Sequence, residues 1–118
     1  MNFNNVVSLP AAVNLGGLEN TAVKLTAAGV DIAGATDRVI GTVIRGAALG
    51  AAADVFLKSN GFHYVRVGNA TAIAIGDELE QAASGSFVKK TTGAAAALAI
   101  EAAPANSNGG GQIRAILL

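Results

Sequence analysis

Apolar and polar side chains alternate in short runs along most of the chain, and glycine-containing turns separate the runs. The pattern is clearest over residues 54–67. Val55 and Leu57 fall on one face of a strand, and residues 62–67 alternate in the same way. Asn60 and Gly61 stand between the two runs, and this pair is a favoured two-residue hairpin turn because both residues tolerate positive φ. The sequence therefore predicts a β-hairpin over residues 54–67.

Other short segments also have the composition of strands. Residues 78–81 and 86–90 form an expected pair that turns at residues 83–85. Alanines 94–97 favour a helix by propensity, but Gly93 precedes them and Pro104 follows soon after, so we expect a strand here. We expect the last segment, residues 112–118, to be paired inside a barrel, because its apolar end must be buried. The remaining predicted strands are residues 21–25, 38–45 and 112–118.

Two parts of the chain have a similar layout. Residues 39–57 and residues 97–118 each read as an apolar strand, a bend of small residues and a second apolar strand. The similarity suggests two hairpins that complete one barrel or sandwich. Short strands with turns at regular spacing are typical of both architectures. The predicted fold is thus all-β, a small β-barrel or sandwich of short antiparallel strands over residues 21–118.

Residues 1–20 differ from the rest, because their apolar side chains follow no clear period. They contain Pro10 and the pair Gly16-Gly17. We expect an extended N-terminal arm that lies on a partner surface; the alternative is a disordered tail. The arm is too apolar for typical disorder. Its candidate contact residues are Phe3, Val6, Val7, Leu9 and Val13.

The composition points to a protein that docks on other proteins. Hydrophobic residues make up 52% of the 118 residues and charged residues 14%, against a usual charged share of about 25%. Much of the apolar excess is alanine, which buries little area, so the core is thin for the length of the chain. Burial of further surface against partners would add stability. We therefore expect an oligomer or a module of a larger assembly.

Charge and hydropathy make several other partners unexpected. Eight Lys and Arg balance eight Asp and Glu, whereas nucleic-acid binding relies on a basic excess and so does binding to anionic membranes. Residues 93–100 are too few for a membrane span, and residues 1–5 do not resemble a signal peptide. We expect neither nucleic acid nor membrane as a partner. The absence of cysteine excludes disulfides and thiolate chemistry.

The residues that catalysis or metal binding would need are scarce. His63 is the only histidine, and a metal site would need further His or Cys ligands. A carboxylate site for Ca²⁺ is conceivable at Asp77, Glu78 and Glu80, but the spacing of a calcium loop is missing, which favours a solvated turn. We expect no metal and no cofactor.

Nucleophilic catalysis is not expected either. Ser59, His63 and Asp54 could be drawn as a triad, but all three fall within one predicted hairpin and nothing indicates an oxyanion hole. Residues 109–111 are three glycines without the frame of a phosphate-binding loop. The sequence therefore indicates a binding or structural protein rather than an enzyme, with no catalytic residues.

Six segments follow one another in an order known from a protein family: residues 39–44, 55–57, 72–79, 84–88, 97–103 and 113–118. The best marker among them is the turn at Gly76 and Asp77. In this order the chain resembles the small capsid decoration (cement) proteins of tailed bacteriophages, over about residues 20–118. Ala99 stands where the second apolar frame of that family usually has glycine.

This resemblance implies a β-barrel-like domain that is usually trimeric. It implies the major capsid protein as partner, docking at three-fold or quasi-three-fold points, and a role in shell cohesion. The protein would be made in the host cytoplasm and located on the capsid surface of the virion. Residues 2–15 are then expected to lie across neighbouring capsid subunits.

Two other functions fit the same sequence. A small glycan- or ligand-binding β module could use Phe62, His63 and Tyr64, although only Phe62 and Tyr64 can share one face of a strand. A component of a phage tail or baseplate would have much the same composition. Both alternatives are non-catalytic.

Overall fold

The computed structural model describes residues 6–58, 61–68, 72–104 and 111–118, and it confirms the all-β class. Its strands are short, as the spacing of the turns predicts. They are β1 (Val6–Pro10), β2 (Ala22–Thr26), β3 (Gly29–Ile32), β4 (Gly41–Arg45), β5 (Ala52–Leu57), β6 (Phe62–Val67), β7 (Glu78–Gln81), β8 (Phe87–Lys89), β9 (Ala97–Ala99) and β10 (Gly111–Leu117), and a 3-10 turn, η1 (Ala83–Gly85), precedes β8.

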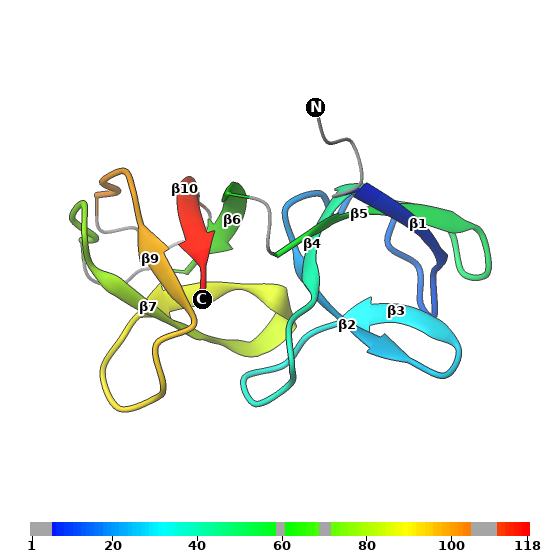
Figure 1. Cartoon of the computed structure of the whole chain (residues 1–118), viewed down its shortest axis with the longest axis horizontal. Helices are drawn as coiled ribbons and strands as arrows, with labels where there is room; N and C mark the ends of the chain where they lie inside the picture. Colours follow the sequence, from blue (N-terminus) through cyan, green and yellow to red (C-terminus); the bar gives the residue numbers. More distant parts are fainter. Residues whose placement is uncertain (1–5, 59–60, 69–71, 105–110) are drawn as a thin grey trace.

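The strands form two units that lie side by side (Figure 1). In the first unit, residues 6–58, a five-stranded sheet has the order β1-β5-β4-β2-β3. In the second unit, residues 61–118, five strands close into a barrel in the order β10-β6-β8-β7-β9. Neighbouring strands run antiparallel, except that β6 and β8 are parallel. A parallel bridge between Ala11 and Val30 joins the two ends of the first sheet.

Each unit surrounds a core of mostly small aliphatic side chains. Leu15, Val23 and Val55 are among the fully buried residues of the first core. Phe87, Ile73 and Leu79 are the largest fully buried hydrophobic side chains of the second core. The second core also contains residues of the first unit, namely Ala22, Ala33 and Val39. The two units therefore share part of a core and do not form independent domains.

The two units repeat one strand topology. β1 pairs with β5, β5 with β4, β4 with β2, and β2 with β3. In the same order, β6 pairs with β10, β10 with β9, β9 with β7, and β7 with β8. The parallel contact of β6 with β8 corresponds to the bridge between Ala11 and Val30. Strands β1–β5 thus correspond one by one to β6–β10.

The correspondence extends to individual backbone hydrogen bonds. In the first unit Asn20 N donates to Val43 O, and in the second unit Gly76 N donates to Ala99 O, so that donor and acceptor have moved by the same number of residues. Asn20 and Gly76 also share the left-handed conformation, with φ of 69° and 90°. Further corresponding donor and acceptor pairs are Thr21 to Leu18 and Asp77 to Ala74, Ile40 to Val23 and Ala96 to Leu79, and Lys58 to Ile40 and Leu118 to Ala96. The molecule is an internal structural duplication.

The hairpin predicted over residues 54–67 is wrong, although both of its strands exist. β5 pairs with β1 and β4, whereas β6 pairs with β10 and β8, so the chain passes from one unit to the other between them. Asn60 lies outside the described residues, and Gly61 has a φ of +83°. A turn fixes only the local chain direction. The pairing is decided by the buried face of β6, which packs with that of β10.

Other predicted hairpins are confirmed. β7 and β8 pair through η1, as expected for residues 78–81 and 86–90. The two hairpins of similar layout are β4–β5 and β9–β10. They complete two different units rather than one barrel, because each hairpin pairs with strands of its own half. The last strand, β10, is enclosed between β6 and β9, as expected from its apolar sequence.

The N-terminal segment differs from the extended arm that we expected. Residues 6–10 form β1, which pairs with β5 along its whole length, and the following Ala11 and Leu15 are buried in the first core. The segment is held because Leu15 N donates to Ala47 O and Ala12 N donates to Val30 O. Residues 6–20 are thus part of the first unit, while residues 1–5 lie outside the described residues.

Candidate functional site

His63 is buried at the junction of the two units. Its ring lies 4.7 Å from the ring of Phe56, and its Nδ1 forms a 2.9 Å hydrogen bond with the hydroxyl of Thr42. Its Nε2 has no hydrogen-bond partner among the described residues. Burial lowers the pKa of His63 below its ordinary value of 6.5, and the backbone of Leu57 and Lys58 acts in the opposite direction. A neutral, enclosed imidazole joins the units but offers no accessible base.

The lowered pKa of His63 makes the stability depend on pH. Above pH 6.5 the imidazole is neutral in both the folded and the unfolded chain, so it adds no dependence. Between pH 6.5 and the lower pKa of the folded state, only the unfolded chain takes up the proton, so the free energy of unfolding falls as pH falls. Urea titrations from pH 7.5 to 5 should show this decrease, and His63→Gln should remove most of it. An equal slope in both proteins would contradict the assignment.

Two of the three acidic residues considered for Ca²⁺, Asp77 and Glu80, accept hydrogen bonds from the backbone, and Glu78 is exposed. Asp77 accepts a hydrogen bond from Ala74 N, which is the main cause of its lowered pKa, and it pairs with Lys89 at 3.5 Å. Glu80 accepts hydrogen bonds from Thr91 N and from Gly93 N. Among the described residues no three acidic, histidine or cysteine side chains gather around a possible metal position. These carboxylates fix turns.

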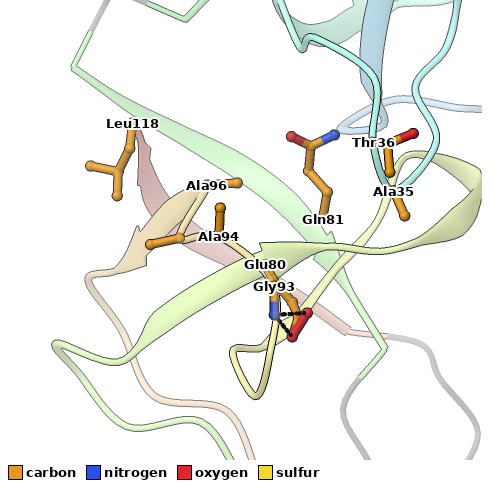
Figure 2. Close-up of a pocket in the computed structure, with 9 residues that line it drawn as sticks. Ala35, Thr36, Glu80, Gln81, Gly93, Ala94, Ala96 and Leu118 are labelled. Carbon is orange, nitrogen blue, oxygen red and sulfur yellow. Dashed lines mark hydrogen bonds between the residues drawn. The ribbon is translucent and has the colours of Figure 1, made fainter.

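A cavity of about 500 Å³ lies between the loop after β3 and the part of the second unit formed by β7, residues 93–96 and Leu118. Figure 2 shows Ala35 and Thr36 on one side and Ala94, Ala96 and Leu118 on the other. Two of its polar side chains are already engaged: Gln81 Nε2 donates to the carbonyls of Gly34 and Asp37, and Glu80 accepts a hydrogen bond from Gly93 N. The cavity has a methyl-rich wall and no nucleophile with a base beside it.

A second, more apolar opening is a groove where the two units meet, with a volume of about 410 Å³. Exposed apolar side chains from both units line it. We call it the junction groove; its residues are Val6, Asn20, Thr42, Ile44, Phe56, Gly61, Phe62 and Tyr64. Val6, Ile44, Phe62 and Tyr64 are each more than a third exposed. A set of exposed apolar side chains gathered in a depression is typical of a protein-docking surface.

The candidate contact residues of the N-terminal segment fall into three groups. Val6 points into the junction groove. Val7, Leu9 and Val13 are half-buried and pack against the first core, so they support β1 from within. Phe3 lies outside the described residues. Of this set, Val6 lines the junction groove, and the sequence analysis did not identify Ile44 and Phe56, which the fold brings beside it.

Phe62 and Tyr64 share the outer face of β6, as the strand period predicts, while His63 points inward. Their ring centroids are 5.9 Å apart in an edge-to-face arrangement. The guanidinium of Arg114 lies 5.8 Å from the centre of the Phe62 ring. Glycan binding by stacking needs a free aromatic face. Here Phe62 contacts both Tyr64 and Arg114, while both rings remain more than a third exposed.

The class of fold defined by this structure is a tandem of two five-stranded β units. A solved structure of the same fold is the N base of the head fiber gp8.5 of bacteriophage phi29. The TM-score is 0.70 at 16% sequence identity, over 96% of this chain and 92% of that chain. No protein-family model and no curated protein sequence matches the chain. Within the described residues no helix is long and apolar enough to cross a membrane.

Proposed function

We propose that the chain is a structural protein of a bacteriophage virion. It decorates and stabilises the head, bound to the outer surface as an oligomer through contacts with the major capsid protein, and it catalyses no reaction. The single observation that carries the proposal is the fold shared with the N base of a phage head fiber, over nearly the whole of both chains. This agreement includes both units and their order.

The surface supports the same function. Binding to a shell requires exposed apolar area, and the junction groove supplies it on both units at once. Each buried Å² of apolar surface contributes roughly 25 cal/mol, so a contact of modest size is weak by itself. Several joined copies bind together at a raised effective concentration. An oligomer that presents several junction grooves can therefore hold a head firmly.

Head binding is the direct test of this proposal. The assay is co-sedimentation of the purified protein with heads assembled from the major capsid protein of the same phage. Ile44→Asp and Val6→Asp should each weaken binding at least about tenfold, because a charge in an apolar contact must lose its hydration. Leu49→Asp is the matched control, since Leu49 is also exposed and apolar but lies outside the groove; its binding should stay near that of the wild type.

Point substitutions are sharper here than deletion of residues 2–15. Such a deletion would remove β1 and the fully buried Leu15, so it would test folding rather than contact. Undiminished binding of Ile44→Asp and Val6→Asp would contradict the role of the groove. Immunogold labelling of tails instead of heads in intact particles would show a tail or baseplate component. Saturable binding to a glycan, competed by groove variants, would favour the glycan module.

A further inference from the structure

The internal duplication lets the contact between the two units serve as a guide to a second contact. Within the chain, one face of the first unit receives one end of the second unit. The contacts include Thr42 with His63 and the backbone of Glu19 with Arg66, whose Nε donates to Glu19 O at 2.9 Å. The second unit therefore covers part of the receiving face of the first unit, and the rest of that face lines the junction groove.

The corresponding face of the second unit is uncovered within the chain. Strand register equates Thr42 with Leu98 and Phe56 with Ile116, and the repeated hydrogen bonds equate Glu19 with Ile75. We call Ile75, Leu98 and Ile116 the receiving face of the second unit. Ile75 is 71% exposed and Ile116 38% exposed, and both are apolar. Ile75 has the largest exposed fraction among the large hydrophobic residues described in the structure.

The corresponding end of the first unit is free as well. The register of β1 with β5 and of β6 with β10 equates Val7 with His63 and Pro10 with Arg66. The hairpins β2–β3 and β7–β8 equate Leu25 with Gln81. We call Val7, Pro10 and Leu25 the inserting end of the first unit. Leu25 is 58% exposed and Pro10 is also exposed.

The receiving face of the second unit and the inserting end of the first unit both lack the polar groups that form the contact within the chain. The polar pair Thr42 and His63 corresponds to Leu98 and Val7, and a third polar contact, between Asn20 and Gln112, corresponds to Gly76 and Ala52. The Arg66 donor to the Glu19 backbone corresponds to Pro10 opposite Ile75, and proline has no side-chain donor. At each position both partners are apolar or small. Two surfaces that face water separately have no reason to lose polarity at matched positions.

From this match we infer that a second copy of the chain docks head to tail, with its inserting end on the receiving face of the second unit. The occupant is another copy for a structural reason. Within the chain the second unit covers part of the receiving face of the first unit, and the structural repeat of the second unit is the first unit, which only another copy can supply. A head-to-tail contact closes into a ring when the rotation between copies allows it, and otherwise grows into a filament. A closed ring of three would give the expected trimer. The inference concerns contacts between copies and can be tested without heads.

Sedimentation of the purified protein tests the inference. The wild type should be an oligomer at micromolar concentration, and Ile75→Glu and Leu25→Glu should each raise the dissociation constant at least about tenfold. Circular dichroism should confirm that both variants are folded, as expected for exposed positions. Ile44→Glu is the matched control because Ile44 is exposed but lies on neither surface. A monomeric wild type, or an oligomer unaffected by Ile75→Glu, would overturn the inference.

Cross-linking provides a second readout that does not depend on weakening the contact. The chain contains no cysteine, so Ile75→Cys combined with Pro10→Cys places two thiols only at the inferred interface. A short bismaleimide should link copies of this variant in high yield, and Ile44→Cys with Pro10→Cys should stay largely unlinked. Equal yields from the two variants would count against the interface.

The two proposals fail in different ways. Ile44→Glu should keep the oligomer and lose head binding, whereas Ile75→Glu should lose the oligomer first. If the pure protein is monomeric and Ile75→Glu abolishes head binding, the head occupies the receiving face and the second copy does not. If the oligomer forms as inferred but neither the wild type nor any variant binds heads, the proposed function fails while the interface stands.

Discussion

Gly41→Ala should destabilise the protein by about 3 kcal/mol or more, although it adds a single methyl group. Gly41 is buried in β4 opposite Leu57, and a Cβ atom there would collide with the backbone oxygen of Phe56. The obstacle is main chain within a sheet, so it cannot move aside as a flexible side chain would. Total stabilities of domains are about 5–15 kcal/mol. The variant should therefore lose a large fraction of the stability of the fold.

Urea denaturation at pH 7.5 measures this effect, and Gly68→Ala is its matched control. Among the described residues no atom lies where a Cβ atom of Gly68 would meet it, and the φ of Gly68 lies outside the left-handed region. Its substitution should change the free energy of unfolding by less than about 0.5 kcal/mol. The position that corresponds to Gly41 in the second unit is Ala97, where a Cβ atom is accommodated. Similar stabilities of the two glycine variants would contradict the tight approach of β4 and β5.

Sequence patterns predicted the strands better than their partners. The alternation in residues 62–67 correctly identifies Phe62 and Tyr64 as outward-facing, because the side-chain period of a strand is a local property. Pairing depends on which distant strand offers a matching buried face. The strong turn signal at Asn60 and Gly61 was therefore misleading, since it marks a passage between units.

The sequence pattern did not predict β1, because the outward-facing residues of this strand are not all polar. Val7 and Leu9 point inward and alternate with Val6, Ser8 and Pro10, which is the pattern of a half-buried strand. Because Val6 is apolar although it faces outward, the period is not visible in the sequence. The same property makes Val6 a candidate contact residue. The sequence analysis therefore selected Val6 as a contact residue, although it expected an extended arm rather than a strand.

The receiving face could not be predicted from the sequence. Ile75, Leu98 and Ile116 are far apart along the chain and come together only through the pairing of β7, β9 and β10. The similar layout of residues 39–57 and 97–118 was a correct signal of the duplication. Its full extent became visible only when strand register and backbone hydrogen bonds could be compared, because the buried positions in the two units differ in side-chain size.

Phe87→Ala should produce the largest loss among single truncations in the core, about 3–5 kcal/mol. Phe87 is fully buried in the second core and is its only aromatic residue among the described positions. Its neighbours are mostly valine and alanine side chains, which are too short to fill the space left by a ring. Val30 occupies the corresponding position in the first unit. Val30→Ala removes much less volume and should cost about 2 kcal/mol.

Comparison of these two variants also tests how strongly the units depend on each other. The second core includes Ala22, Ala33 and Val39 of the first unit, and Gly85 N donates to Ala33 O across the junction. Loss of the second core therefore exposes apolar surface of the first unit, so both should unfold in one cooperative transition. Calorimetry should show a single transition in the wild type and in both variants, with the midpoint lowered more by Phe87→Ala. Two separate transitions, only one of which moves in each variant, would mean that the shared core does not couple the units.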